Sequence, residues 1–134
     1  MSVEKLQKEM LKMPQVEIET SHSFCGGVYA REIKIPKGVC LVGAKHKTRF
    51  FMVLSKGRCL IVDVDIKKEI SAPFTGVSEV GAKRSIFAVE DAVLTTFHPT
   101  KKTDVKSIEN EIIENEGLAI QNNSGLSLIN GSLK

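Results

Sequence analysis

Residues 29–43 read YAREIKIPKGVCLVG. Apolar and polar side chains alternate over Tyr29–Ile35, which is typical of a strand with one buried face. In Pro36-Lys37-Gly38 the proline presets φ and the glycine tolerates a positive φ, so we expect a turn there and a second strand at Val39–Gly43. Strand, turn and strand in so short a stretch indicate antiparallel β structure.

The same pattern of short strands and turns continues from Val28 to Pro99, where short runs of Val, Ile, Phe and Thr are separated by Gly and Pro. Ser55-Lys56-Gly57 predicts a hairpin closed by a left-handed glycine, and Glu90-Asp91 predicts a tight turn. Besides the two strands above, we expect strands at residues 50–54, 58–64, 66–71, 74–78, 85–89 and 92–97. So many short strands need barrel closure or a two-sheet sandwich to protect their edges.

Short helices are expected on both sides of this β segment. Ser2–Lys12 has an apolar residue every three to four positions and stops before Pro14, so it predicts an amphipathic helix whose apolar stripe is covered by the body of the protein or by a second subunit. Thr103–Asn115 returns to helical spacing, with Thr103 or Asp104 as its cap. We therefore divide the chain into an N-terminal helix and arm (1–27), a β-barrel (28–100) and a C-terminal helix and tail (101–134).

Three segments carry weaker signals. The polar run Thr20–Ser23 predicts an exposed loop containing His22, and Cys25-Gly26-Gly27 predicts a flexible turn. Leu118–Lys134 is rich in Asn, Ser and Gly, so we interpret it as a weakly ordered tail or as strands that need a partner surface.

The composition of the 134 residues is that of an ordinary globular domain, with 42% hydrophobic and 26% charged residues. The 19 Lys and Arg exceed the 16 Asp and Glu by only three, and aromatic residues make up 5% with no Trp, so we expect no nucleic-acid partner. The absence of a signal peptide or of an apolar run of about 18 residues predicts a cytoplasmic protein without a membrane span. Three cysteines without C-x-x-C spacing fit a reducing compartment, with Cys40 and Cys59 in the core.

Three groups of short motifs bear on the fold family. They are Ile35-Pro36-Lys37-Gly38 with Val42–Thr48 and Leu54–Gly57, then Ile70–Phe74 with Val80–Arg84, and then Thr95–Thr100 with Thr103–Glu109. On these motifs the chain from Val28 to Glu114 resembles a cupin, and the third group is similar to small cupin-like proteins of tailed bacteriophages. The resemblance implies a mainly β, cupin-like jelly-roll barrel with short N-terminal and C-terminal helices.

The resemblance also implies a metal site, which this sequence does not preserve. His46 matches the first His of the cupin H-x-H motif, but Thr48 stands where the second would be and Arg84 stands in place of the third metal His. A catalytic cupin metal usually takes three His and a carboxylate, and a fixed guanidinium would repel a divalent ion. We therefore expect no metal, no cofactor and no catalytic residues.

A basic group at one mouth of the barrel remains as a candidate ligand site. His46, Lys45 or Lys47, Lys83 and Arg84 would favour a small anion, because arginine offers a planar fork for carboxylate or phosphate. The alternative is that these side chains only solvate the rim.

His98 completes the candidate ligand set. It follows a strand and precedes Asp104 at a helix start, an arrangement that suits general base catalysis or plain anchoring by a hydrogen bond.

The leading functional hypothesis is a non-catalytic cupin-like binding or interaction module. It would form a homo-oligomer and capture a small anionic ligand such as a nucleotide, or a protein partner, in the host cytoplasm of a bacteriophage infection. The alternatives are a degenerate metal-dependent cupin enzyme using His46 with His98, a metal-free acid–base site at His98 and Asp104, and a virion structural component. Because fold does not fix function, the choice between them depends on the geometry of the site.

Overall fold

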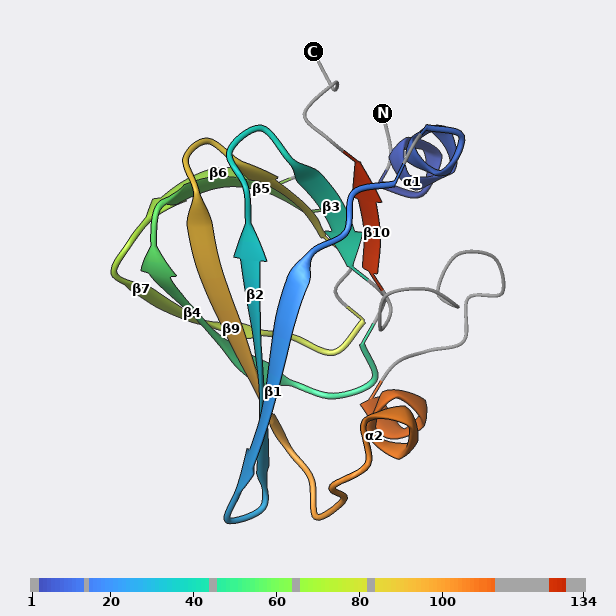
Figure 1. Cartoon of the computed structure of the whole chain (residues 1–134), viewed down its shortest axis with the longest axis vertical. Helices are drawn as coiled ribbons and strands as arrows, with labels where there is room; N and C mark the ends of the chain where they lie inside the picture. The colour runs from blue at the N-terminus through green and yellow to red at the C-terminus, as the bar shows by residue number, and fades with distance from the viewer. Residues whose placement is uncertain are drawn as a thin grey trace.

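The computed structural model describes residues 3–13, 15–43, 46–63, 66–81, 84–112 and 126–129. Two five-stranded antiparallel sheets face each other (Figure 1). The first sheet has the order β1-β2-β9-β4-β7 and the second the order β10-β3-β8-β5-β6. The strands are β1 (Glu19–Cys25), β2 (Val28–Ile35), β3 (Cys40–Gly43), β4 (Phe50–Lys56), β5 (Arg58–Asp63), β6 (Ile66–Ser71), β7 (Phe74–Ser78), β8 (Ser85–Ala88), β9 (Ala92–Pro99) and β10 (Leu126–Ile129).

Every strand predicted between Val28 and Pro99 is present, whereas β1 was not predicted. It occupies the segment expected to be a loop around His22. Its residues pair with β2 from Glu19↔Lys34 to Cys25↔Val28. The prediction failed because β1 is a polar edge strand exposed on both faces, so it lacks the alternation that marks a half-buried strand.

The hairpin predicted at Ser55-Lys56-Gly57 is wrong. Strand β4 pairs with β7 and β9 in the first sheet, whereas β5 pairs with β6 and β8 in the second, so the chain crosses between sheets at this glycine. Gly57 has φ +87°, and a Cβ atom there would clash with the backbone carbonyl of Asp91. The backbone N of Ala72 donates to the Gly57 carbonyl over 2.9 Å. Thus β4–β5 and β6–β7 form one antiparallel ribbon that bends at Gly57 and Ala72.

A second ribbon bends in the same way. Strand β2 pairs with β9, and β3 pairs with β8, so the chain changes sheets between β2 and β3 and again between β8 and β9. The backbone N of Gly38 donates to the Ala88 carbonyl, and that of Lys37 to Asp91 Oδ1, each over 2.8 Å. Two bent ribbons that wrap around a common interior make the expected jelly roll.

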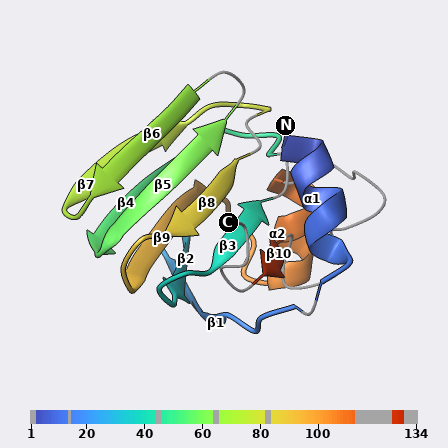
Figure 2. The same cartoon turned by 90° about the horizontal axis from the view of Figure 1, so that it is seen from above.

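Helix α1 (Val3–Leu11) lies against the second sheet, beside β3 and β10 (Figure 2). Met10 is fully buried and packs with Cys40 and Val42, and Leu6, Met13 and Phe87 join this cluster. The body of the same chain therefore covers the apolar stripe, and no second subunit is needed for it.

Helix α2 (Val105–Ile112) follows the barrel, and Asp104 is its cap. The Asp104 carboxylate accepts hydrogen bonds from the Ser107 backbone N at 3.1 Å and the Ser107 hydroxyl at 2.8 Å. Neither described helix is long and apolar enough to cross a bilayer. Within the predicted tail Leu118–Lys134, residues 126–129 form β10, and the others lie outside the described residues.

An aliphatic core fills most of the space between the sheets. As predicted, Cys40 and Cys59 are buried, each 1% exposed. The core residues from the inward faces of the strands are Ile33, Ile35, Val39, Leu41, Met52, Leu54, Cys59, Ile61, Ile70, Ile86, Ala88, Ala92 and Leu94. This core leaves one end of the interior open, and the candidate site lies there.

Candidate functional site

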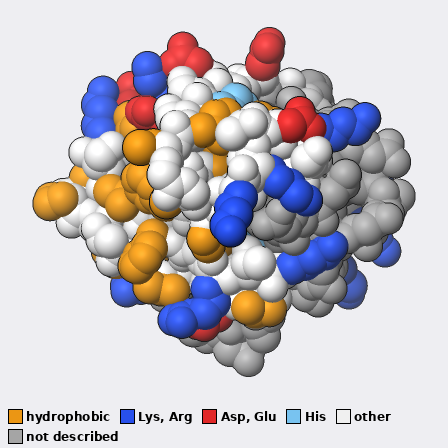
Figure 3. Space-filling model, turned by 90° about the horizontal axis from the view of Figure 1, so that it is seen from below, with side chains coloured by type: hydrophobic (Ala, Val, Ile, Leu, Met, Phe, Trp, Pro, Cys, Tyr) orange, Lys and Arg blue, Asp and Glu red, His pale blue; other side chains and the backbone are white. Residues whose placement is uncertain are grey.

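A pocket opens between the sheets at the end where β2 begins and β9 finishes. The space open to the centre of a water molecule is about 80 Å³, and all empty space in and in front of the pocket, open solvent included, is about 640 Å³. Figure 3 shows this end of the molecule, where hydrophobic and basic side chains both reach the surface. The described residues that line it are Arg31, Ile33, Leu41, Gly43, His46, Phe50, Met52, Ser78, Arg84, Ile86, Leu94, Thr96 and His98.

The inward face of β2 and β9 changes from aliphatic to polar along the strands. Since every second residue faces the interior, the pocket side chains are the continuation of the core rows. The paired inward positions are Ile35↔Ala92, Ile33↔Leu94, Arg31↔Thr96 and Tyr29↔His98. The site is therefore a polar extension of the core.

His98 is one of two deeply buried polar residues of the pocket lining, with 2% of its surface exposed against 1% for Ser78. Its Nε2 is 2.9 Å from the Thr96 hydroxyl, and its Nδ1 is buried without a hydrogen-bond partner in the described part of the chain. Burial, with smaller effects of His46 and Arg31, lowers the pKa of His98 to about 3. The ring is consequently neutral near pH 7, and one of its two nitrogens is buried without a hydrogen-bond partner among the described residues.

The predicted pairing of His98 with Asp104 is wrong. Asp104 is exposed, and its carboxylate is engaged by Ser107 at the start of α2, whereas His98 is hydrogen-bonded to Thr96. The Asp104 carboxylate lies at the start of α2 and not beside His98, because the first backbone N–H groups of a helix need hydrogen-bond acceptors.

Aromatic rings cluster beside His98. The ring of His46 lies 4.4 Å from that of Phe50 and 5.7 Å from that of His98, and Phe50 lies 4.7 Å from His98. On its other side His98 stacks on Tyr29 at 5.7 Å. The rings of His46, Phe50 and His98 give the pocket an aromatic wall, in which Phe50 is tilted by 43° and 35° against the two imidazoles.

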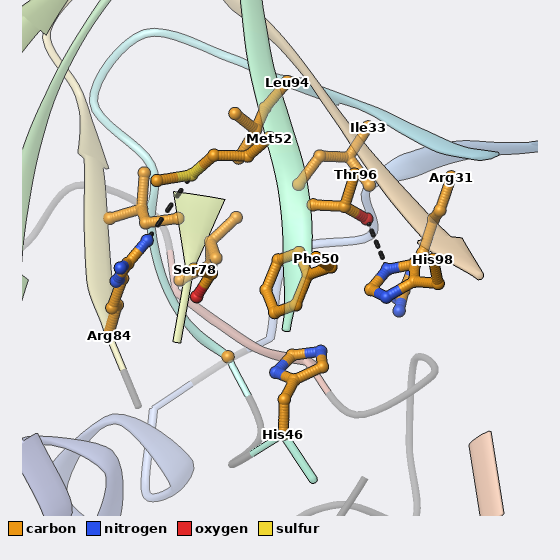
Figure 4. Close-up of a pocket in the computed structure, with 13 residues that line it drawn as sticks. Arg31, Ile33, His46, Phe50, Met52, Ser78, Arg84, Leu94, Thr96 and His98 are labelled. Carbon is orange, nitrogen blue, oxygen red and sulfur yellow. Dashed lines mark hydrogen bonds between the residues drawn. The ribbon is translucent and has the colours of Figure 1, made fainter. Parts of the chain in front are cut away.

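Two arginines contribute the positive charge. Arg84 stands just before β8 in the second sheet, and its Nη1 lies 3.6 Å from the sulfur of Met52. The backbone N of Gly43 donates to the Arg84 carbonyl over 3.0 Å, which holds this part of the chain in place. Arg31 comes from β2 in the first sheet and lies beside His98 (Figure 4).

Of the predicted site residues, His46, Arg84 and His98 line this one pocket, and their role in binding stays a prediction. Lys45 and Lys83 lie outside the described residues. Arg31 was missed, although the sequence carried a signal for it, since it occupies the same parity as Ile33 and Ile35 in the alternating stretch YAREIKI.

The donors present do not fit the metal that the fold family implies. The described lining offers two imidazoles but no Asp, Glu or Cys, and the part of the chain that the structure describes contains no group of three such ligands. Catalytic transition-metal sites usually take at least three such protein ligands, and the two guanidiniums oppose a cation electrostatically.

Comparison with solved structures identifies the fold. A cupin-superfamily protein from Desulfitobacterium hafniense superposes with a TM-score of 0.57 at 8% identity, over 66% of this chain and 83% of that one. A cupin-2 domain protein from Shewanella frigidimarina gives 0.51 at 14%, over 71% and 91%. An acetylacetone dioxygenase from Acinetobacter johnsonii gives 0.51 at 15%, over 61% and 59%.

No protein-family model matches the sequence, and no curated protein matches it either. The likeness to solved structures lies in the fold alone, because all three identities are low. The fold is a cupin-like jelly-roll barrel with two short helices.

Proposed function

We propose that this cupin-like module is non-catalytic and captures a small anionic ligand in the pocket between its sheets. The observation that carries the proposal is the charge of the lining: Arg31 and Arg84 line the pocket, and none of its described lining residues is acidic. Guanidinium groups in a partly enclosed, low-dielectric site bind carboxylate or phosphate through paired, charge-assisted hydrogen bonds.

The rest of the lining supports a ligand with an apolar or planar part. Six lining residues are hydrophobic, and Phe50 presents its ring next to two imidazoles. Small-molecule sites typically combine such an apolar wall with a few polar groups that fix orientation. A nucleotide is one ligand of this kind, and an aromatic acid is another.

The proposal is tested by thermal unfolding and calorimetric titration with inorganic phosphate, benzoate and adenosine monophosphate. A ligand that binds only the folded state stabilises it by about 2.7 kcal/mol at a hundred times its Kd, so at least one probe should raise the Tm. Arg84→Ala should abolish that rise. Arg49→Ala is the matched control, because Arg49 is exposed, lies outside the pocket and pairs with Glu79 at 2.9 Å.

Two results would contradict the proposal. One is a ligand-induced rise in Tm that survives Arg84→Ala, and the other is no binding of any of the three anions. Stoichiometric Fe, Mn, Ni or Zn in protein purified without chelator would instead support the metal-enzyme alternative. The bacteriophage setting, the cytoplasmic location, self-association and the virion alternative stay predictions of the sequence.

A further inference from the structure

The two guanidiniums of the pocket come from different walls. Arg31 is carried by β2 of the first sheet, and Arg84 stands just before β8 of the second. Figure 4 shows them on opposite sides of the pocket, with Phe50 between them. A ligand in the pocket therefore meets a fixed positive charge on each side.

Each arginine has neutral polar neighbours on its own side. Thr96 and His98 lie beside Arg31, and Ser78 lies on the side of Arg84 (Figure 4). His98 Nδ1 is buried and has no hydrogen-bond partner among the described residues, so it marks a polar position that a bound group would satisfy. Both sides thus combine a cation with groups that can complete the hydrogen bonding of an acid.

The space between the two sides is apolar. Phe50 and Met52 of β4 face it, and Ile33 and Leu94 close it from the neighbouring strands. A ligand with a single acidic group can meet only one of the two guanidiniums, because they stand on opposite walls of the pocket. Two anionic groups held apart by an apolar spacer would match both walls and the surface between them.

We propose that the pocket takes a small ligand with two separate anionic groups joined by an apolar or aromatic spacer, one group at Arg31 and the other at Arg84. This inference rests on the proposed function and narrows its ligand class to diacids.

Linear dicarboxylates from succinate to suberate, each compared with its monomethyl ester, test the inference by isothermal titration. Replacing a dicarboxylate by its monomethyl ester removes one negative charge and leaves the length of the molecule nearly unchanged. At the best length the diacid should bind at least about tenfold more tightly than its ester, since a charge-assisted hydrogen bond is worth about 1.5–3 kcal/mol. In Arg31→Met and in Arg84→Met that ratio should fall close to one, and in Arg49→Met it should stay unchanged.

Arg31→Lys keeps the experiment decisive if Arg31→Met does not fold, because it retains the charge and loses the planar fork. It should weaken binding of the diacid more than binding of the ester.

Several outcomes would overturn the inference. If monoesters bind as tightly as diacids and depend on Arg84, the anion pocket stands and the diacid class is wrong. If inorganic phosphate binds best and needs both arginines, one doubly charged group is the ligand. If none of the acids binds, the inference and the proposed function both fail.

Discussion

The two ends of the space between the sheets differ in chemistry, although the same strands build both. At one end the inward rows of β2 and β9 finish in Ile35 and Ala92, which are 1% and 3% exposed. At the other end the same rows reach Arg31 and His98. The change from aliphatic to polar side chains takes only a few inward-facing positions along each strand. Such a division lets the aliphatic end hold the barrel together while the polar end contains the candidate site.

The largest expected effect is a loss of folding stability caused by a substitution at the aliphatic end. Leu54 is fully buried in β4, so Leu54→Ala should lower the free energy of unfolding by about 2–5 kcal/mol, through lost burial and the cavity left behind. Urea unfolding measures this. Anion binding by the protein that remains folded should be unchanged, because Leu54 does not line the pocket. A loss below about 1 kcal/mol would mean that this end does not dominate stability.

The next prediction tests the polar end through pH. His98 has a pKa of about 3 in the folded protein against an ordinary value of 6.5, so the folded state binds fewer protons than the unfolded state between these values. The stability that the neutral ring supports is fully present above pH 6.5 and is lost as the pH falls towards 3. The loss approaches about 1.4 kcal/mol per pH unit at most, the full effect of one proton.

The comparison of His98→Gln with the native chain isolates this effect. Urea unfolding at a series of pH values should show a shallower dependence below pH 6.5 in the variant. Burial and Arg31 also lower the pKa of His22, which contributes with the same sign, so His22→Gln is the matched control. The groups that face His98 are Tyr29, His46, Phe50, Arg31 and Thr96, and neither variant replaces any of them. The control does alter one neighbour, because His22 Nδ1 lies 2.6 Å from the Tyr29 hydroxyl. Superimposable pH profiles of His98→Gln and the native chain would contradict the burial of a neutral imidazole.

Local patterns predicted the strands between Val28 and Pro99 and the left-handed Gly57, but they missed β1 and did not predict which strands pair. Ser55-Lys56-Gly57 fits a hairpin and fits equally a corner between sheets, because both need a left-handed residue at a sharp change of direction. The choice is made by the pairing of β4 with β7 and of β5 with β6, which depends on residues farther along the chain. Long-range pairing of this kind leaves no signature in the turn itself.

The candidate site was predicted only where motifs pointed to it. His46 and Arg84 occupy the positions of metal ligands in the cupin motifs, so the resemblance predicted them as site residues. Arg31 matches no motif. Strand parity alone places Arg31 on the inward face with Ile33, and pairing with β9 then brings it beside Thr96. The expected contact between His98 and Asp104 failed for a different reason, since a helix cap competes for the same carboxylate.

The smallest expected effect concerns the outer face of strand β4, where the contrast between neighbouring residues is sharpest. Phe50 faces the pocket and is 8% exposed, whereas Phe51 faces outward and is 55% exposed, opposite Val77 of β7. Phe51→Thr should change the free energy of unfolding by less than about 1 kcal/mol, the range of cross-strand pairs. Urea unfolding measures this, with Leu54→Ala as the comparison from the inner face.

Sedimentation of the Phe51→Thr variant tests the predicted self-association, because an interface between copies on this face would weaken when an exposed aromatic ring is removed. A loss of several kcal/mol that depends on protein concentration would show that Phe51 is buried in an oligomer, and the contrast between the faces of β4 would then hold only for the isolated chain.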